Sequence, residues 1–455
     1  MQQKIVPAGD RALLIELGAV SAAGLHAAAA AARSHPEVVA CIVGQRSLYV
    51  LFRGEPDENL FLGGAGEMAP RPARRRTIEV SFRDEYGPDL APFLSHTGIT
   101  RSEFFSRLAS VTLTARYLGF RGGFAYLDGW PEEWAMPRRP TSRPVARGSF
   151  ALAGSVAGFY PIDSPGGWNV LGRTAESLEH AIRPGDQFTI TASERKLDLP
   201  AVPRVRAIEI AGTAINGPLA TVVGAMDETR LEEGRPSGGP YDARASSLAN
   251  RLVGNGDDAP VVECAMVGPH VRFTSPRLVA WCGADCDLPQ GRAFLAAEVT
   301  AGRIRGGLRG YLSVVSEDPA FRIRDTAPDA GSLALEAAQH ASSIGSSDRR
   351  RIRVLQGPHA SPIGSIECEV TSQLDRVGIR LRPVSELRFS PPADLPSCGM
   401  QFGTVQLHPD GSLVAMGPDH PVTGGYLQPL TVLSSERWKL GHLTPGERMW
   451  FVAEP

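Results

Sequence analysis

Hydrophobic and polar residues along this chain form short runs that glycine and proline interrupt. Residues 11–18 (RALLIELG) predict a strand, and the alanine-rich residues 21–33, opened by the capping residue Ser21, predict a helix. Residues 41–54 are strand-like again. The strand–helix–strand order predicts a small N-terminal α/β unit that ends in a basic, Gly/Pro-rich linker at residues 63–76.

A second unit follows the linker. Thr100 and Glu103 have the spacing of a capping box, which predicts a helix to about residue 109. From residue 120 to 205 the short apolar runs predict antiparallel β structure. Further on, Asp242 is placed to cap a helix that ends at Gly254, and residues 261–273 predict a strand, a turn and a strand. We therefore divide the chain into residues 1–76, 77–205 and 206–455.

Three weak motifs occur twice in the same order. Their landmark glycines are 255, 258 and 261 residues apart, at Gly148/Gly403, Gly167/Gly425 and Gly185/Gly446. Each motif alone is a common turn, but the ordered set at a nearly constant offset predicts a duplicated β module. The fold class expected is α+β and mainly β, with two barrel halves and the small N-terminal domain.

The central motif of each copy is a glycine pair before an aromatic residue, SPGGW at 164–168 and VTGGY at 422–426. Glycine permits a positive φ and leaves no Cβ above the backbone. One interpretation is a tight bend whose aromatic ring fills a barrel end. The other is a pocket whose bare amides receive an anionic group. We expect the two loops to frame one small-molecule cleft.

Composition narrows the class of protein. The chain has 455 residues, 42% of them hydrophobic, so a globular protein of more than one domain is expected. Its net charge of -2 favours neither nucleic acid nor a membrane surface as a partner. The six cysteines are scattered, which indicates buried thiols in a reducing cytoplasm. The first residues lack the apolar core of a signal peptide, and no apolar run reaches membrane-spanning length.

Familiar catalytic signatures are missing from the sequence. It contains no phosphate loop, no dinucleotide fingerprint, no zinc helix motif and no serine nucleophile elbow.

Residues 117–130 combine glycines and aromatics, which suits either a planar or carboxylated ligand or a self-packed hairpin. Glu263 lies within an apolar strand and needs a partner, for which Arg244 or Arg251 is available. Arg376 precedes a strand and is placed to hold an anion or to form a local salt bridge.

Taken together, these stretches resemble a pair of bacterial families. The first half, with YLGFRGGFAYLDG and YPIDSPGGWNVLGRT, is similar to allophanate hydrolase subunit 1, now assigned as the B subunit of 5-oxoprolinase, in a family that includes a sporulation kinase inhibitor. The second half, with SLANRLVGN, SQLDRVGIRL and HPVTGGY, is similar to allophanate hydrolase subunit 2, which is the C subunit of 5-oxoprolinase. The chain thus resembles a fusion of the two, and the same modules form the carboxyltransferase part of urea carboxylase.

The resemblance implies two cyclophilin-like β barrels and a component of an ATP-dependent enzyme. With a separate partner that resembles the A subunit of 5-oxoprolinase, such an enzyme opens the lactam of 5-oxoproline to glutamate. ATP, with magnesium, is the implied co-substrate, and a homo-oligomer is possible. One alternative is a carboxyltransferase module that uses biotin and acts on urea. Another is a regulatory binding protein without catalysis, since the loop at 121–130 departs from the family pattern.

The candidate site residues combine local chemistry with positions that match the family motifs. No metal ligands are among them. The catalytic candidates are Glu263, Arg376 and Tyr126; the candidates for binding substrate or nucleotide are Gly122, Gly123, Phe124, Ser164, Gly166, Gly167, Trp168, Arg173, Asn250, Thr423, Gly424, Gly425 and Tyr426.

Overall fold

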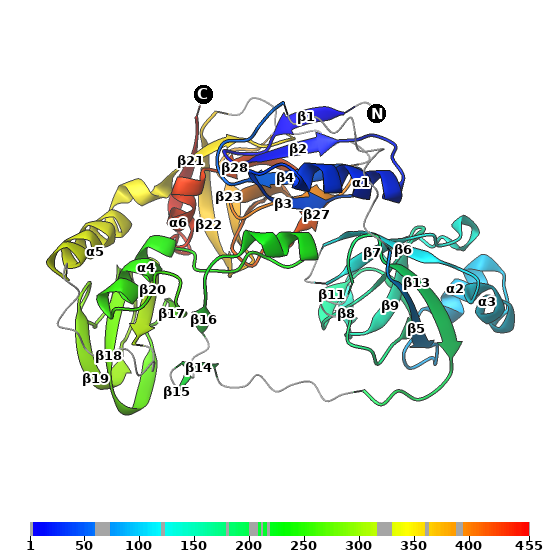
Figure 1. Ribbon diagram of the computed structural model, residues 1–455, viewed down its shortest axis with the longest axis horizontal. Coiled ribbons are helices and arrows are strands. Elements are labelled where there is room, and N and C mark those ends of the chain that lie inside the picture. The colour runs from blue at the N-terminus through cyan, green and yellow to red at the C-terminus, as the bar shows by residue number, and fades with distance from the viewer. Residues whose placement is uncertain are drawn as a thin grey trace.

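The structure is a computed structural model (Figure 1). It describes residues 3–59, 73–119, 123–178, 182–199, 208–210, 213–215, 219–315, 330–359, 364–387 and 395–454. Within these residues no helix is both long enough and apolar enough to cross a membrane.

Seven described strands of the first half close into a barrel. They are β5 (Arg75–Ser81), β6 (Leu113–Leu118), β7 (Ala125–Asp128), β9 (Ser149–Ala153), β10 (Val156–Phe159), β12 (Asn169–Arg173) and β13 (Gln187–Ser193). The barrel core is rich in aromatic rings, including Phe82, Phe150 and Trp130. Helices α2 (Leu90–Thr97) and α3 (Arg101–Leu108) add Phe93 and Phe104 to that core. Thr100 caps α3 by accepting the Glu103 N–H, as predicted.

A second closed barrel repeats the first. Its strands are β21 (Arg351–Gln356), β22 (Ile366–Leu374), β23 (Gly378–Pro383), β25 (Thr404–Leu407), β26 (Leu413–Met416), β28 (Leu427–Val432) and β29 (Arg448–Ala453). Numbered along the chain within each barrel, the strands follow the same circular order, 1-6-4-5-3-2-7. In both barrels the first and last strands pair in parallel.

The landmark glycines occupy equivalent places in the two barrels. Gly148 and Gly403 both adopt a positive φ directly before the fourth strand, and Gly185 and Gly446 do so before the seventh. Each barrel also carries a small two-stranded ribbon next to the glycine pair. The ribbons are β8 (Arg143–Val145) with β11 (Ser164–Gly166), and β24 (Cys398–Gly399) with β27 (Thr423–Gly424). The predicted duplication is therefore confirmed at the level of topology.

The N-terminal unit is a four-stranded antiparallel sheet with one helix. Its elements are β1 (Lys4–Pro7), β2 (Ala12–Glu16), α1 (Ala22–Arg33), β3 (Val38–Val43) and β4 (Ser47–Phe52), in sheet order β1-β2-β4-β3. The single strand expected at 41–54 is wrong, because residues 44–46 turn the chain and β4 enters the sheet between β2 and β3. Arg75 and Arg76, expected in the linker, begin β5 instead, while linker residues 63–72 lie outside the described residues.

This N-terminal sheet contacts both barrels. One face packs against α1 and against Tyr117 of the first barrel. The other face, with Tyr49 and Leu51, packs against Cys398 and Val422 of the second barrel. The N-terminal sheet thus lies against the barrel that is farther away along the chain (Figure 1).

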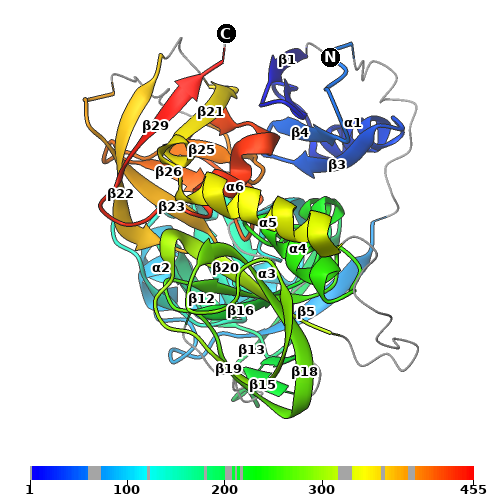
Figure 2. The same ribbon diagram turned by 90° about the vertical axis from the view of Figure 1, so that its left-hand side faces the viewer.

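The remaining described part of the second half is a five-stranded sheet, in order β16-β17-β20-β18-β19. Its strands are β16 (Ala220–Val223), β17 (Val261–Ala265), β18 (His270–Asp285), β19 (Ala293–Thr300) and β20 (Arg305–Val314). Helices α4 (Ala243–Leu252) and α5 (Ala330–Gly345) pack against each other and against β18 and β20 (Figure 2). Asp242 caps α4 by accepting the Ala245 N–H, as predicted. A short ribbon, β14 (Ile208–Ile210) with β15 (Thr213–Ile215), and the short helix α6 (Arg437–Leu440) complete the set.

Candidate functional site

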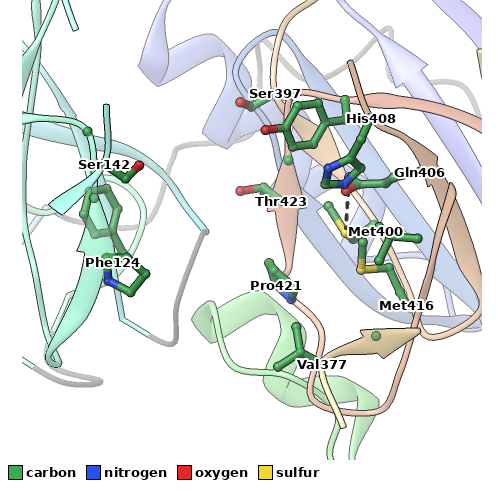
Figure 3. A pocket seen from close by; sticks show the side chains of 18 of the residues that line it. Phe124, Ser142, Val377, Ser397, Met400, Gln406, His408, Met416, Pro421 and Thr423 are labelled. Carbon is green, nitrogen blue, oxygen red and sulfur yellow. Dashed lines mark hydrogen bonds between the residues drawn. The ribbon is translucent and has the colours of Figure 1, made fainter. Parts of the chain in front are cut away.

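A cavity of about 990 Å³ lies between the two barrels. Gly166, Gly167 and Trp168 line it from the first barrel, and Thr423, Gly424, Gly425 and Tyr426 line it from the second. Figure 3 shows Phe124 and Ser142 on one side of this space and Gln406, His408 and Thr423 on the other. The two glycine-pair loops therefore frame one cleft, as the duplication predicts.

Three of the four paired glycines, Gly166, Gly167 and Gly424, are needed for close approach and not for an unusual backbone. None of them adopts a positive φ, so that expectation is wrong. A Cβ at Gly166 would lie 2.1 Å from the Tyr160 hydroxyl oxygen, and one at Gly424 would lie 2.7 Å from Cε of Met400. At Gly167 a Cβ would lie 2.9 Å from Nε of Arg138. Side chains from the cavity wall thus occupy the space that larger residues would fill.

The first barrel gives the cavity an aromatic wall. The Trp168 ring meets the rings of Phe124 and Tyr126 edge to face, with centroids 5.3 and 5.6 Å apart. Tyr126 also stacks on Tyr117 at 4.2 Å. Burial raises the pKa of Tyr126 far above its usual value, although Arg138 opposes the shift. Tyr126 is therefore a neutral phenol at physiological pH, suited to hydrogen bonding and not to service as a general base.

The second barrel gives a mixed wall that sequence reasoning missed. His408 stacks on Tyr426, with ring centroids 4.2 Å apart. Burial lowers the pKa of His408, and its buried Nε2 has no hydrogen-bond partner among the described residues. Gln406 donates a hydrogen bond to Sδ of Met400, which also lines the cavity. These residues come together only when the strands of the second barrel pair. No local sequence pattern therefore predicts that they share a site.

Glu263 and Arg376 meet, but away from this cavity wall. The Arg376 Nη1 donates to Glu263 Oε1 at 2.7 Å, and Arg309 Nε lies 3.4 Å from the same oxygen. The other carboxylate oxygen accepts hydrogen bonds from the Tyr241 N–H and the Tyr311 hydroxyl, both at 3.0 Å. Burial opposes the charge of Glu263, but the two guanidiniums outweigh it and hold its pKa below the usual value.

The partners expected for Glu263 are wrong. Arg244 and Arg251 both pair with Glu336, a residue on α5. Arg376 in turn makes two hydrogen bonds to Asp419 and one to the Gly239 carbonyl. The geometry of Glu263 and Arg376 is that of an ion network that joins the five-stranded sheet to the second barrel, and neither residue lines the cavity.

Several binding candidates have partners of their own. Thr423 donates from Oγ1 to the Leu118 carbonyl and so joins the barrels. Arg173 Nε donates to the Arg147 carbonyl, and Ser164 is buried in the β8–β11 ribbon. Asn250 binds two loop carbonyls through Nδ2 and accepts from the Ser313 hydroxyl. Gly123 adopts a positive φ beside the cavity residue Phe124, whereas Gly122 lies outside the described residues.

Comparison with protein families matches one model to each half of the chain, although the first match ends before β13, the last strand of the first barrel. Residues 3–182 match the model for the carboxyltransferase domain, subdomains C and D. Residues 233–318 and 321–453 match the model for the carboxyltransferase domain, subdomains A and B. Each half thus carries one subdomain pair.

Known proteins resemble the two halves separately. The B subunit of 5-oxoprolinase from Escherichia coli O157:H7 is 33% identical over 168 residues, which cover 33% of this chain and 76% of that protein. The C subunit of 5-oxoprolinase from Escherichia coli K12 is 26% identical over 253 residues, 47% of this chain and 81% of the relative. A putative urea carboxylase of Emericella nidulans is 26% identical over 270 residues, 47% of this chain but only 22% of the relative.

One solved structure covers almost the whole molecule. The crystal structure of TTHA0988 superposes with a TM-score of 0.74 at 25% identity, covering 98% of this chain and all of the other. A solved structure therefore exists in which one polypeptide has the same fold over almost the whole length of this chain.

Proposed function

The chain belongs to the family of carboxyltransferase domains that includes the B and C subunits of 5-oxoprolinase, and on that premise we propose that it is a component of an ATP-dependent enzyme that opens an amide or lactam. The reaction proposed is the conversion of 5-oxoproline to glutamate, carried out with a separate partner that resembles the A subunit of that enzyme. We place this enzyme in the cytoplasm, because all six cysteines are free buried thiols, as expected in a reducing compartment.

The observation that carries the proposal is the shared cavity. One glycine-pair loop comes from the half that resembles the B subunit, and the other comes from the half that resembles the C subunit. Neither half alone encloses the space. A ligand site that needs both halves accounts for their presence in one chain.

The cavity residues suit a small planar ligand. The Trp168 and Phe124 rings provide apolar faces for a lactam ring, and the Tyr126 phenol is a neutral donor beside them. His408, whose pKa is lowered, offers an uncharged nitrogen at the opposite wall. A lactam carbonyl is a poor electrophile, so its opening needs activation of the oxygen, and fixed neutral donors stabilise the charge that develops there.

The described cavity does not fit a magnesium–triphosphate site. Such a site needs several cations or a glycine-rich nest, together with carboxylates that share a metal ion. Of the two arginines at this cavity, Arg380 is already paired with Asp410, at 2.9 Å. Among the described residues no group of three His, Cys, Asp or Glu side chains is placed to hold a metal ion. We assign no ATP step to these residues.

The proposal is tested by combining the purified chain with its proposed partner, ATP and 5-oxoproline, and measuring glutamate. Trp168→Ala should raise KM, because it removes part of the aromatic wall. Leu295→Ala is the matched control, since Leu295 is exposed on β19 at 69% of its surface. The proposal fails if no glutamate forms, or if both variants behave like the native chain.

A carboxyltransferase role is the second candidate. The names of both matching family models and the likeness to a putative urea carboxylase favour it. Biotin would be its cofactor, supplied on a carrier outside this chain. Carboxylation of urea that depends on biotin and ATP, with no glutamate formed from 5-oxoproline, would select this function. Partner binding with neither activity would indicate a regulatory protein.

A further inference from the structure

Three arginines of the first barrel lie close together near the cavity, and two of them share one carboxylate. Arg139 Nη1 donates to Asp89 Oδ1 at 2.9 Å, and Arg143 bonds to the other oxygen of the same carboxylate. Asp89 is buried and also accepts the Val170 N–H. These two arginines and the backbone use three of the roughly four acceptor sites of the carboxylate, and Arg138 is not among its partners in the described part of the chain.

Arg138 is the third. Its side chain lines the cavity, and within the described part of the chain it forms no hydrogen bond or ion pair. The guanidinium lies over Gly167, where a Cβ would be 2.9 Å from Nε and 3.5 Å from an Nη atom. Its charge also acts on Tyr126 and Tyr160, opposing the rise of pKa that burial causes in both phenols. Arg138 is thus an exposed cation at the edge of the aromatic wall that pairs with no side chain of the described residues.

The opposite wall does not neutralise this charge. Arg380 pairs with Asp410 and with the Ser412 hydroxyl. Asp375 lines the cavity, but its Oδ1 accepts the N–H groups of its own turn, from Val377 and Gly378, and it forms no ion pair with Arg138. A ligand that brings an anionic group into the cavity would supply the missing partner.

We infer that Arg138 binds a carboxylate group of the ligand in the cavity between the barrels. A guanidinium offers two parallel N–H groups that match the two oxygens of a carboxylate, whereas urea offers one carbonyl oxygen and no charge. The assignment of the ligand as the reacting substrate rests on the proposed function, whereas the binding of a carboxylate does not. Arg138 is a binding and positioning residue.

The test is calorimetric titration of the full chain with two lactams. 5-Oxoproline carries a carboxylate, and 2-pyrrolidinone is the same ring without it. Arg138→Gln should weaken 5-oxoproline binding about 10- to 100-fold, the range for losing a charged hydrogen-bonded pair. Arg138→Lys should lie between, and binding of 2-pyrrolidinone should not change. Because Arg138 has no partner among the described residues, both variants should melt at the temperature of the native chain.

A pair of glycine variants tests the geometry independently. Gly167→Ala places a methyl against the Arg138 guanidinium and should weaken 5-oxoproline binding. Gly54→Ala is the control, because Gly54 lies outside the cavity and an added Cβ there would have no atom within 4 Å, so this variant should have little effect. In the glutamate assay, Arg138→Gln should raise KM by the factor found in the titration and leave kcat nearly unchanged.

The outcomes separate the two proposals. If the Arg138→Gln chain binds 5-oxoproline as tightly as the native chain does, Arg138 is not the carboxylate ligand, even where glutamate still forms. If the native chain ignores 5-oxoproline but binds propionate or glutamate through Arg138, the residue assignment holds and the proposed reaction is wrong. If no carboxylate binds to the native chain, the inference is overturned.

Discussion

Replacing Glu263 with glutamine should destabilise the second half of the molecule without touching the cavity. Glu263 and Arg309 each expose only 3% of their side chains, and Arg376 exposes 16%. Breaking a buried ion pair by removing one partner costs about 3–5 kcal/mol, because the other charge is left uncompensated. Arg376 keeps Asp419, so we expect the low end, about 3 kcal/mol for Glu263→Gln.

The assay is urea unfolding, followed by a probe of the second half. With a slope of about 3 kcal/mol per molar, the midpoint should fall by about 1 M. The control is Glu298→Gln, which removes an exposed pair with Arg272 and should change stability by less than about 1 kcal/mol. Under conditions where both variants are folded, their kcat/KM should equal that of the native chain. A Glu263→Gln protein of native stability and no activity would refute the structural role and restore the catalytic one.

The same carboxylate predicts a dependence on pH. The pKa of Glu263 is lower in the folded protein than in the unfolded chain, where it is about 4.3. Its stabilisation is therefore complete above that pH and is lost as the pH falls toward the depressed folded value. As the pH falls below about 4.3, the free energy of unfolding should therefore decrease less in Glu263→Gln than in the native chain.

Two further predictions concern the seam between the barrels and the thiols. Gly119→Ala should cost about 2 kcal/mol or more, because its Cβ would lie 1.6 Å from Thr423 Oγ1. Adding Thr423→Gly should recover only part of this loss, because it removes the clash, leaving the Thr423 Cα at 3.5 Å, but also removes the hydrogen bond to the Leu118 carbonyl. Thermal unfolding of the single and double variants checks this, and an unrescued double variant would contradict it. The six cysteines should resist a chromogenic disulfide reagent at pH 8 until denaturant is added, because all are buried and burial raises the pKa of Cys41 and Cys398 to about 12. A thiol titrated within minutes in the native protein would disprove it.

Local signals predicted much of the fold. The caps at Ser21, Thr100 and Asp242 are visible in sequence because each satisfies backbone N–H groups a few residues away. The duplicated module was visible because three glycine motifs recur in the same order at a nearly constant offset. Both kinds of feature depend on residues that are close along the chain, or on a pattern that repeats.

Features that depend on distant residues could not be predicted in this way. Glu263 was expected beside arginines of the preceding helix, but its partner Arg376 is more than a hundred residues away in the sequence. No sequence pattern singled out Arg138, because its role depends on which arginines pair with the distant Asp89. Asp89 accepts hydrogen bonds from Arg139 and Arg143 and not from Arg138. His408 enters the site only through the pairing of strands in the second barrel.

The position of the N-terminal sheet limits how the molecule can deform. The two faces of the sheet contact different barrels: one lies under α1 and reaches Tyr117, and the other packs against Cys398 and Val422. Pulling the barrels apart would hydrate at least one of these faces, which is a large free-energy cost for an opening motion. Entry of a ligand therefore need not separate the barrels, because the cavity between them is already open to solvent and Tyr426 in its wall exposes 42% of its surface.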